Sequence, residues 1–167
     1  MSVQDHERAS RGLAVRVAIV TLSDTRTRET DTSGQAIERH LRQGGFDVAA
    51  YELLPDDAGQ LTATLGRLLD GDAVDAVICT GGTGLSRRDT TVDALAALFE
   101  RSLPGFGEIF RQQSFAEIGH AAMLSRATAG VVRGRIVFAL PGSRGAVDLG
   151  MQLITPVLRH LVAELRK

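Results

Sequence analysis

Lysine is almost missing from this chain of 167 residues: Lys167 is the only one, and the remaining strongly basic side chains are all arginines. A Walker A phosphate loop and a Schiff-base mechanism both need a lysine within the fold, so the sequence excludes them. Cysteine is just as scarce. Cys79 stands alone in an apolar run, which rules out a disulfide framework and predicts a small buried residue rather than a reactive thiol.

Long hydrophobic runs are also lacking. No stretch is long and uncharged enough to span a bilayer, and the first residues have no signal-peptide core. The formal net charge of -1 gives no reason to expect nucleic acid or an anionic membrane as a partner. A chain of this length buries about 70% of its unfolded surface, which is enough for one core. We therefore expect a single-domain cytoplasmic protein.

Apolar runs and amphipathic patterns alternate through the first part of the chain. Residues 1–14 are polar and patternless and are expected to form a flexible leader, and residues 15–167 a single domain. Strand-like runs cover residues 15–21, 46–54 and 74–80, and each is followed by helical spacing. This alternation predicts an α/β fold, a three-layer α/β/α sandwich with a mostly parallel central sheet.

The pattern changes beyond residue 103. Residues 106–118 have helical spacing, and the apolar pieces 131–132 and 136–140 fit either a hairpin or successive strands. Residues 146–165 predict a terminal helix that Pro156 should kink or divide, because proline cannot donate the backbone hydrogen bond of a helix interior.

A glycine-rich loop directly follows the third expected strand, and it carries the strongest chemical signal in the chain. Its residues are Thr80, Gly81, Gly82, Thr83 and Gly84. So little side-chain bulk lets backbone N–H groups close around phosphate oxygens, with the threonine hydroxyls as further donors. The loop therefore predicts a phosphate cradle.

Charged residues follow this loop. Arg87 and Arg88 supply cations for an anion, and Asp89 supplies a carboxylate able to hold Mg²⁺. A dinucleotide fingerprint is the first alternative, but its third glycine is absent and the loop follows the third strand rather than the first. A purely structural turn is the second alternative and stays open.

Other loops are expected to join this one at the same edge of the sheet. Ser23 and Asp24 follow the first strand, Asp56 the second, and the segment Pro141, Gly142, Ser143 a late one. The carboxyl ends of parallel strands share one edge, where ligands of α/β sheets bind. Two carboxylates among glycine loops and arginines suit metal-assisted phosphoryl or nucleotidyl transfer.

Several of these residues also have ordinary structural explanations. Asp56 could make a turn or cap the next helix, and Asp89 could cap the helix that starts near Thr91. The histidines lack metal-ligand spacing and are expected on surfaces or helix faces. Phe106, Phe110 and Phe115 could stack against a heterocyclic ring, although core packing or a subunit interface is the favoured explanation.

Seven motifs in order give the chain a resemblance to the MoaB/MogA family of molybdenum cofactor biosynthesis, of molybdopterin adenylyltransferase type, and to its MoaB branch in particular. They are residues 21–26 (Thr-Leu-Ser-Asp-Thr-Arg), 31–34 (Asp-Thr-Ser-Gly), 80–84 (Thr-Gly-Gly-Thr-Gly), 88–89 (Arg-Asp), 104–108 (Pro-Gly-Phe-Gly-Glu), 124–127 (Leu-Ser-Arg-Ala) and 140–143 (Leu-Pro-Gly-Ser). One departure is Ser143-Arg144, where many members of the family carry Ser-Pro.

The resemblance implies a molybdopterin-binding domain that assembles as a homotrimer or homohexamer. It implies a reaction in which molybdopterin and Mg-ATP give adenylyl-molybdopterin and pyrophosphate, with the molybdenum insertion enzyme as a further partner. By motif, the functional acids of the family fall on Asp56 and Asp89. Some MoaB-branch members lack such acids and are inactive, so their presence here favours activity. A non-catalytic molybdopterin-binding or carrier protein of the same pathway is the alternative, and a structural assembly factor is a second.

The resemblance and the loop chemistry together assign roles to residues. Asp56 and Asp89 are expected to act in catalysis and to hold Mg²⁺, which arrives with ATP. Nucleotide and phosphate binding falls on Thr80, Gly81, Gly82, Thr83, Gly84, Arg88, Pro141, Gly142 and Ser143. Pterin binding falls on Ser23, Asp24, Asp31, Ser125 and Arg126.

Overall fold

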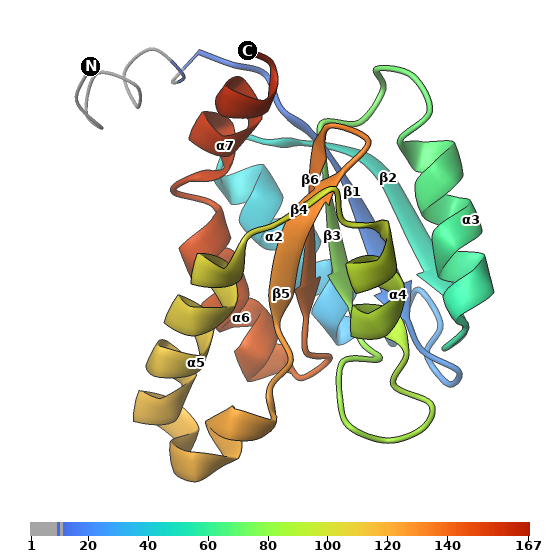
Figure 1. The fold of residues 1–167 in the computed structure, drawn as a ribbon, viewed down its shortest axis with the longest axis vertical. Helices are drawn as coiled ribbons and strands as arrows, with labels where there is room; N and C mark the ends of the chain where they lie inside the picture. The colour runs from blue at the N-terminus through green and yellow to red at the C-terminus, as the bar shows by residue number, and fades with distance from the viewer. Residues whose placement is uncertain (1–9, 11) are drawn as a thin grey trace.

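The computed structural model describes residue 10 and residues 12–167 of the chain. Within this part a single sheet has six strands in the order β2-β1-β3-β6-β5-β4 (Figure 1). The strands are β1 (Arg16–Leu22), β2 (Asp47–Leu54), β3 (Ala76–Thr80), β4 (Arg101–Ser102), β5 (Thr128–Val132) and β6 (Arg135–Leu140).

Four neighbouring strands run parallel. β1 pairs in parallel with β2 and with β3, and β3 pairs in parallel with β6, whereas β5 is antiparallel to both β6 and β4. The carboxyl ends of β1, β2, β3 and β6 therefore share one edge of the sheet, at the lower end of Figure 1. The prediction of a mostly parallel sheet is confirmed, and β5 and β6 form a hairpin rather than successive parallel strands.

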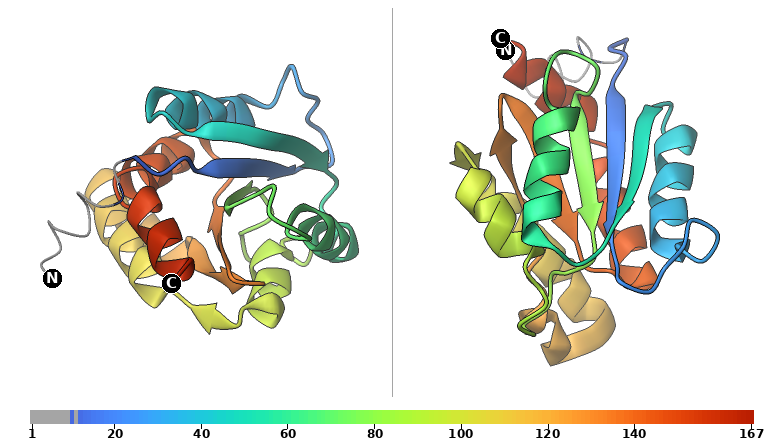
Figure 2. Two further views of the ribbon diagram at one scale, coloured as in Figure 1. Left: turned by 90° about the horizontal axis from the view of Figure 1, so that it is seen from above. Right: turned by 90° about the vertical axis from the view of Figure 1, so that its right-hand side faces the viewer.

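Helices cover both faces of the sheet, as the three-layer prediction requires. They are α2 (Thr32–Gln43), α3 (Ala58–Leu68), α4 (Thr91–Leu98), α5 (Pro104–Ile118), the 3-10 helix η1 (Gly119–Leu124), α6 (Arg144–Ile154) and α7 (Leu158–Leu165). One face is covered by α2, α5, α6 and α7, and the other by α3 and α4. Figure 2 shows from two further directions that the sheet separates α2 from α3.

Strand β1 explains why these layers form. Val17 and Ile19 pack into the hydrophobic core on the α2 side, while Ala18 and Val20 pack into the core on the α3 side. Because alternate residues of a strand point to opposite faces, a continuous apolar run is what a strand buried on both faces needs. Cys79 on β3 is fully buried, and burial raises the pKa of its thiol to about 12, so the predicted core role is confirmed.

The two ends of the described chain meet the core in different ways. Pro156 lies between α6 and α7, so the predicted terminal helix is divided there. Leu13 packs against the core, and its carbonyl oxygen accepts a hydrogen bond from Arg159 Nε at 3.3 Å, so core contacts begin before Val15. The rest of the predicted leader, residues 1–9 and residue 11, lies outside the described residues.

Within the described part, no helix combines the length and apolarity that a membrane crossing requires.

A buried carboxylate links the start of β1 to the residue that follows α7, at the amino ends of the parallel strands. Asp75, which is 4% exposed, accepts hydrogen bonds from Arg16 N at 2.8 Å and Arg16 Nε at 3.1 Å, and from Arg166 Nη2 at 2.6 Å. Burial alone would raise the pKa of Asp75, but the hydrogen bonds from Arg16 and Arg166 lower it to about 2. The ionised carboxylate therefore stabilises the fold.

Replacing this carboxylate should weaken the fold in a pH-dependent way. We expect Asp75→Asn to lower the free energy of unfolding at pH 7 by about 2 kcal/mol, from a pKa difference of roughly two units between folded and unfolded chains. Because the folded pKa is the lower one, the contribution is complete above about pH 4 and is lost as the pH falls toward 2. Urea unfolding of wild type and variant at pH 7 and pH 3 measures this. As a control, Asp72→Asn removes an ion pair with Arg135 from a side chain that is 95% exposed, and should change stability by less than about 1 kcal/mol.

Candidate active site

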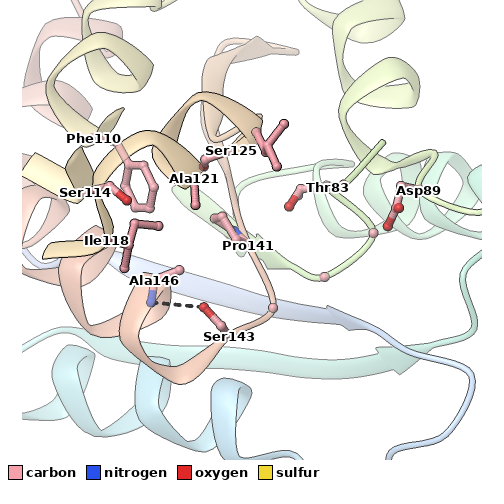
Figure 3. Close-up of a pocket in the computed structure, with 15 residues that line it drawn as sticks. Thr83, Asp89, Phe110, Ser114, Ile118, Ala121, Ser125, Pro141, Ser143 and Ala146 are labelled. Carbon is pink, nitrogen blue, oxygen red and sulfur yellow. Dashed lines mark hydrogen bonds between the residues drawn. The ribbon is translucent and has the colours of Figure 1, made fainter. Parts of the chain in front are cut away.

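A cavity of about 350 Å³ opens at the carboxyl edge of the parallel strands. Figure 3 shows the glycine loop after β3 and the loop after β6 on one side of it, with side chains of α5 and η1 on the other. The lining residues are Gly81, Gly82, Thr83, Gly84, Asp89, Phe110, Ser114, Ile118, Ala121, Leu124, Ser125, Pro141, Gly142, Ser143 and Ala146. The two predicted phosphate loops therefore meet in one place.

The glycine loop has a backbone that other residues would not easily adopt. Gly81 and Gly82 have φ angles of 95° and 64°, in the left-handed region. A Cβ atom on Gly81 would lie 2.2 Å from the carbonyl oxygen of Leu22 at the end of β1. The loop therefore needs glycine both for its conformation and for its close approach to the neighbouring strand.

Both predicted catalytic acids lie against this loop. An added Cβ on Gly82 would be 3.3 Å from Asp56 Oδ1, and one on Gly84 would be 2.7 Å from Asp89 Oδ2. Asp56 belongs to the loop after β2 and Asp89 to the loop after β3. The parallel sheet thus brings the two carboxylates from separate segments to the same loop backbone.

Asp56 has an unsatisfied oxygen. Its Oδ1 atom is buried and has no hydrogen-bond partner among the described residues. Burial and the nearby charge of Asp89 raise the pKa of Asp56. The suggested role as a helix cap falls to its neighbour instead, because Asp57 accepts the hydrogen bond from Gln60 N at 2.7 Å at the start of α3. Asp56 therefore presents a carboxylate oxygen that the protein itself does not use.

Asp89 stays ionised, and its negative charge acts on Asp56. Hydrogen bonds from Ser86, including one from its backbone N–H to Asp89 Oδ2 at 2.9 Å, hold the pKa of Asp89 below its usual range despite some burial. Asp89 does not cap α4, whose N-cap residue is Thr90. Mg²⁺ is commonly held by one or two carboxylates together with substrate phosphates. Two acids, one with an orphaned oxygen, beside a glycine loop fit such an ion.

The loop after β6 supplies the second backbone wall. Ser143 caps α6, with its Oγ accepting a hydrogen bond from Ala146 N at 3.3 Å. The first N–H groups of a helix have no partner within it and attract anions. An added Cβ on Gly142 would lie 3.4 Å from Gly81 Cα, so the two loops touch.

Two predicted phosphate ligands are engaged elsewhere. Thr80 is fully buried, and its hydroxyl donates to the carbonyl oxygen of Pro141 at 3.2 Å, which links the two loops. Arg88 forms an ion pair with Asp24, whose Oδ1 accepts the backbone N–H of Asp56 at 3.0 Å. The side chain of Arg88 is 75% exposed and lies outside the cavity lining. A role of Arg88 in binding phosphate stays a prediction.

Most of the residues predicted to bind pterin lie outside the lining of the cavity. Ser125 lines the cavity, and its Oγ is buried with no partner in the described part of the chain. Ser23 Oγ accepts the Arg26 N–H at 3.2 Å in a turn, and Asp31 is fully buried as the N-cap of α2. Arg126 pairs with Asp93 at 2.7 Å. Only Ser125 of this group lies in the cavity lining, and pterin binding by all of them stays a prediction.

Only one residue of the apolar wall of the cavity, Phe110, was found from the sequence, where it was considered for stacking against a heterocyclic ring. The wall consists of Phe110, Ile118, Ala121, Leu124 and Ala146, with the hydroxyl of Ser114 among them. Phe110 is 1% exposed and packs in the core as well, in line with the core role considered for it. Ser114, a polar residue amid the helical spacing of 106–118, is a further signal in the sequence that could have marked this face.

The orphaned carboxylate of Asp56 makes a prediction about stability. Because the raised pKa means that the ionised form of Asp56 destabilises the fold at neutral pH, we expect Asp56→Asn to raise the melting temperature at pH 7. The gain should shrink as the pH falls and Asp56 takes up a proton. Differential scanning fluorimetry measures it, with Asp57→Asn as the matched control, since Asn caps a helix about as well as Asp. A lower melting temperature for Asp56→Asn would contradict the destabilising effect of the ionised Asp56 carboxylate.

Comparisons with known proteins agree with the fold and the motifs. Residues 18–160 match the family described as "Probable molybdopterin binding domain". Molybdenum cofactor biosynthesis protein B of Bacillus subtilis is 47% identical over 169 aligned residues, covering 100% of this chain and 99% of that protein.

Solved structures give the same result. A crystal structure of a molybdenum cofactor biosynthesis protein B is 45% identical with a TM-score of 0.89, covering 92% of this chain and 97% of the other. The tungsten cofactor synthesizing protein MoaB from Pyrococcus furiosus is 34% identical with a TM-score of 0.84, covering 92% and 98%. Identity at this level over nearly the whole length means that the chain belongs to the molybdenum cofactor biosynthesis protein B family, built on the molybdopterin-binding domain.

Proposed function

We propose that this protein transfers AMP from ATP to the terminal phosphate of molybdopterin, giving adenylyl-molybdopterin and pyrophosphate, within molybdenum cofactor biosynthesis. The placement of Asp56 and Asp89 against one glycine loop supports this most directly, because an unused carboxylate oxygen beside a phosphate cradle fits a nucleotide-bound metal ion. The family names of the relatives support the pathway, and the geometry supports the reaction class.

Different residues of the site would bind the metal ion and the phosphate groups of the substrates. Asp56 and Asp89 would hold Mg²⁺, which when bound neutralises phosphate charge and orients the phosphates. The backbone N–H groups of Gly82–Gly84, of Ser143 and of the first turn of α6 would bind the phosphate groups of the two substrates, including those that leave as pyrophosphate. Backbone donors of this kind are fixed before the substrates arrive, so they cost little reorganisation during the reaction.

The proposed AMP transfer needs no general base. A phosphate monoester is largely ionised at neutral pH, so its oxygen attacks the α-phosphorus of ATP while the bond to pyrophosphate breaks, without a base to remove a proton. The chief obstacles are repulsion between anions and correct alignment. This agrees with a cavity whose lining contains glycines and the carboxylate of Asp89 but no histidine.

The apolar wall suits the ring of a substrate. Phe110, Ile118 and Ala121 lie across the cavity from the glycine loop, with the hydroxyls of Ser114 and Ser125 among them (Figure 3). Ligand pockets commonly combine such apolar lining with a few polar groups that fix orientation. A heterocycle with exocyclic donors and acceptors, as in adenine or a pterin, matches this combination.

Removing the charge of Asp89 should nearly abolish the reaction. We expect Asp89→Asn to reduce AMP transfer by about a hundredfold to a thousandfold, the typical loss for one preorganised electrostatic element. Its oxygen can still accept the Ser86 N–H, so the circular dichroism spectrum should be unchanged. Turnover is measured by pyrophosphate release from molybdopterin and Mg-ATP. Asp47→Asn, at the exposed start of β2 on the opposite edge of the sheet, is the control and should keep wild-type turnover.

The same assay separates the enzyme from a carrier. Wild-type protein that binds molybdopterin but releases no pyrophosphate from ATP would replace the proposed transferase with a molybdopterin-binding protein. Wild-type turnover in Asp89→Asn would refute the role of that carboxylate and leave the reaction itself in place.

A further inference from the structure

The carbonyl group of Gly142 is held by two side chains from a different part of the chain. Its oxygen accepts a hydrogen bond from Ser33 Oγ at 2.7 Å and from Arg26 Nη2 at 3.2 Å. Arg26 follows β1 and Ser33 lies in the first turn of α2, whereas Gly142 follows β6. Two donors on one carbonyl of a cavity-lining glycine fix the orientation of that peptide group.

These donors are themselves anchored. Arg26 Nη1 lies 3.4 Å from Asp31 Oδ1, and Asp31 is fully buried. The same carboxylate accepts Gly34 N at 2.9 Å and Tyr51 Oη at 2.6 Å. Gly34 has no space for a side chain, since an added Cβ would lie 1.9 Å from Tyr51 Oη. Arg26 is therefore attached to a rigid group that spans α2 and β2.

The orientation of the Gly142 carbonyl determines that of the next N–H group. No cis peptide bond occurs among the described residues, and in a trans peptide the carbonyl and the following N–H point in opposite directions. With the carbonyl held by Arg26 and Ser33, the Ser143 N–H is directed away from them, at the capped start of α6. Glycine has little resistance to rotation, so without the donors this peptide could turn and present its carbonyl oxygen to an incoming anion.

We infer that Arg26 and Ser33 are positioning residues, which hold the Gly142–Ser143 peptide with its N–H toward the phosphate and its carbonyl away from it. The inference rests on the proposed function. Neither side chain needs to touch a substrate: both act through a backbone group that lines the cavity. A carbonyl turned into the cavity would repel a phosphate, whereas the held N–H attracts it.

Two mild substitutions test the inference. Ser33→Ala and Arg26→Gln each remove one donor, and we expect each to weaken pyrophosphate binding, measured by calorimetry, by about tenfold or more and to lower kcat/KM for AMP transfer to a similar degree. Because both donors act on one carbonyl, the double variant should lose less than the product of the two single losses. The amide resonance of Ser143, which should shift when pyrophosphate is added to the wild type, should shift less in the variants.

Matched variants separate positioning from general damage. Arg42→Gln removes a cation from α2 that pairs with Glu38 on the same helix, and it should leave binding and turnover unchanged. Arg26→Lys keeps the charge but donates less well to two acceptors at once, and it should be intermediate. Melting temperatures of all variants report any loss of the fold itself.

The outcomes for the two proposals are distinct. Wild-type pyrophosphate affinity and kcat/KM in both Ser33→Ala and Arg26→Gln would overturn the positioning role, even with lowered melting temperatures. Wild-type protein that binds pyrophosphate through the Ser143 amide but transfers no AMP would overturn the proposed reaction and leave the positioning role standing.

Discussion

Close contact between the backbones of three segments at the edge of the sheet is the constraint on which the site depends. Gly81 lies against the Leu22 carbonyl at the end of β1, and Gly142 lies against Gly81. A side chain at Gly81 would push the ends of β1 and β3 apart, and the loop after β6 would lose its contact with them. Because the loops meet without side chains between them, the backbone of the glycines itself lines the cavity.

The acids of this fold fall into two groups, and the difference marks Asp56 as a candidate functional residue. Asp31 and Asp75 are almost fully buried, yet their hydrogen bonds lower their pKa values and make them stabilising. Asp56 is less buried but lacks a partner for one oxygen, and burial together with Asp89 raises its pKa. A carboxylate kept at a cost in stability is a common mark of function, because binding a cation repays that cost.

The sequence predicts the layers of the fold well because the signals are local. Strands apolar on both faces require helices on both sides, and Pro156 divides the last helix wherever the rest of the chain lies. The β5–β6 connection stayed open between two arrangements for a physical reason. Its two turn residues, Arg133 and Gly134, both have positive φ angles of 49° and 71°. Arginine stands where Asn or Asp usually announces such a hairpin turn, so the usual signal is missing.

In the candidate site, too, some features are encoded locally in the sequence and others depend on the folded chain. Its phosphate half is built by backbone groups, and the glycines and acids that shape it are visible in the sequence at Gly81–Gly84, Asp56 and Asp89. Pairings such as Asp24 with Arg88, or Arg26 with the Gly142 carbonyl, join residues far apart in the chain and depend on how the loops fold together.

The apolar half depends on side-chain packing alone. Phe110 and Ser114 reach the cavity because α5 packs beside α6, and Arg111 on α5 donates to the carbonyl oxygen of Ala127 at 3.2 Å, which helps to place the adjoining segment with Ser125. No local pattern encodes that docking. The backbone shape of the two loops can therefore be predicted from this sequence, because glycine and proline encode it locally. The shape of the apolar wall is encoded only by the packed fold, so the proposed binding of a heterocycle would depend on α5 and η1 rather than on the motifs.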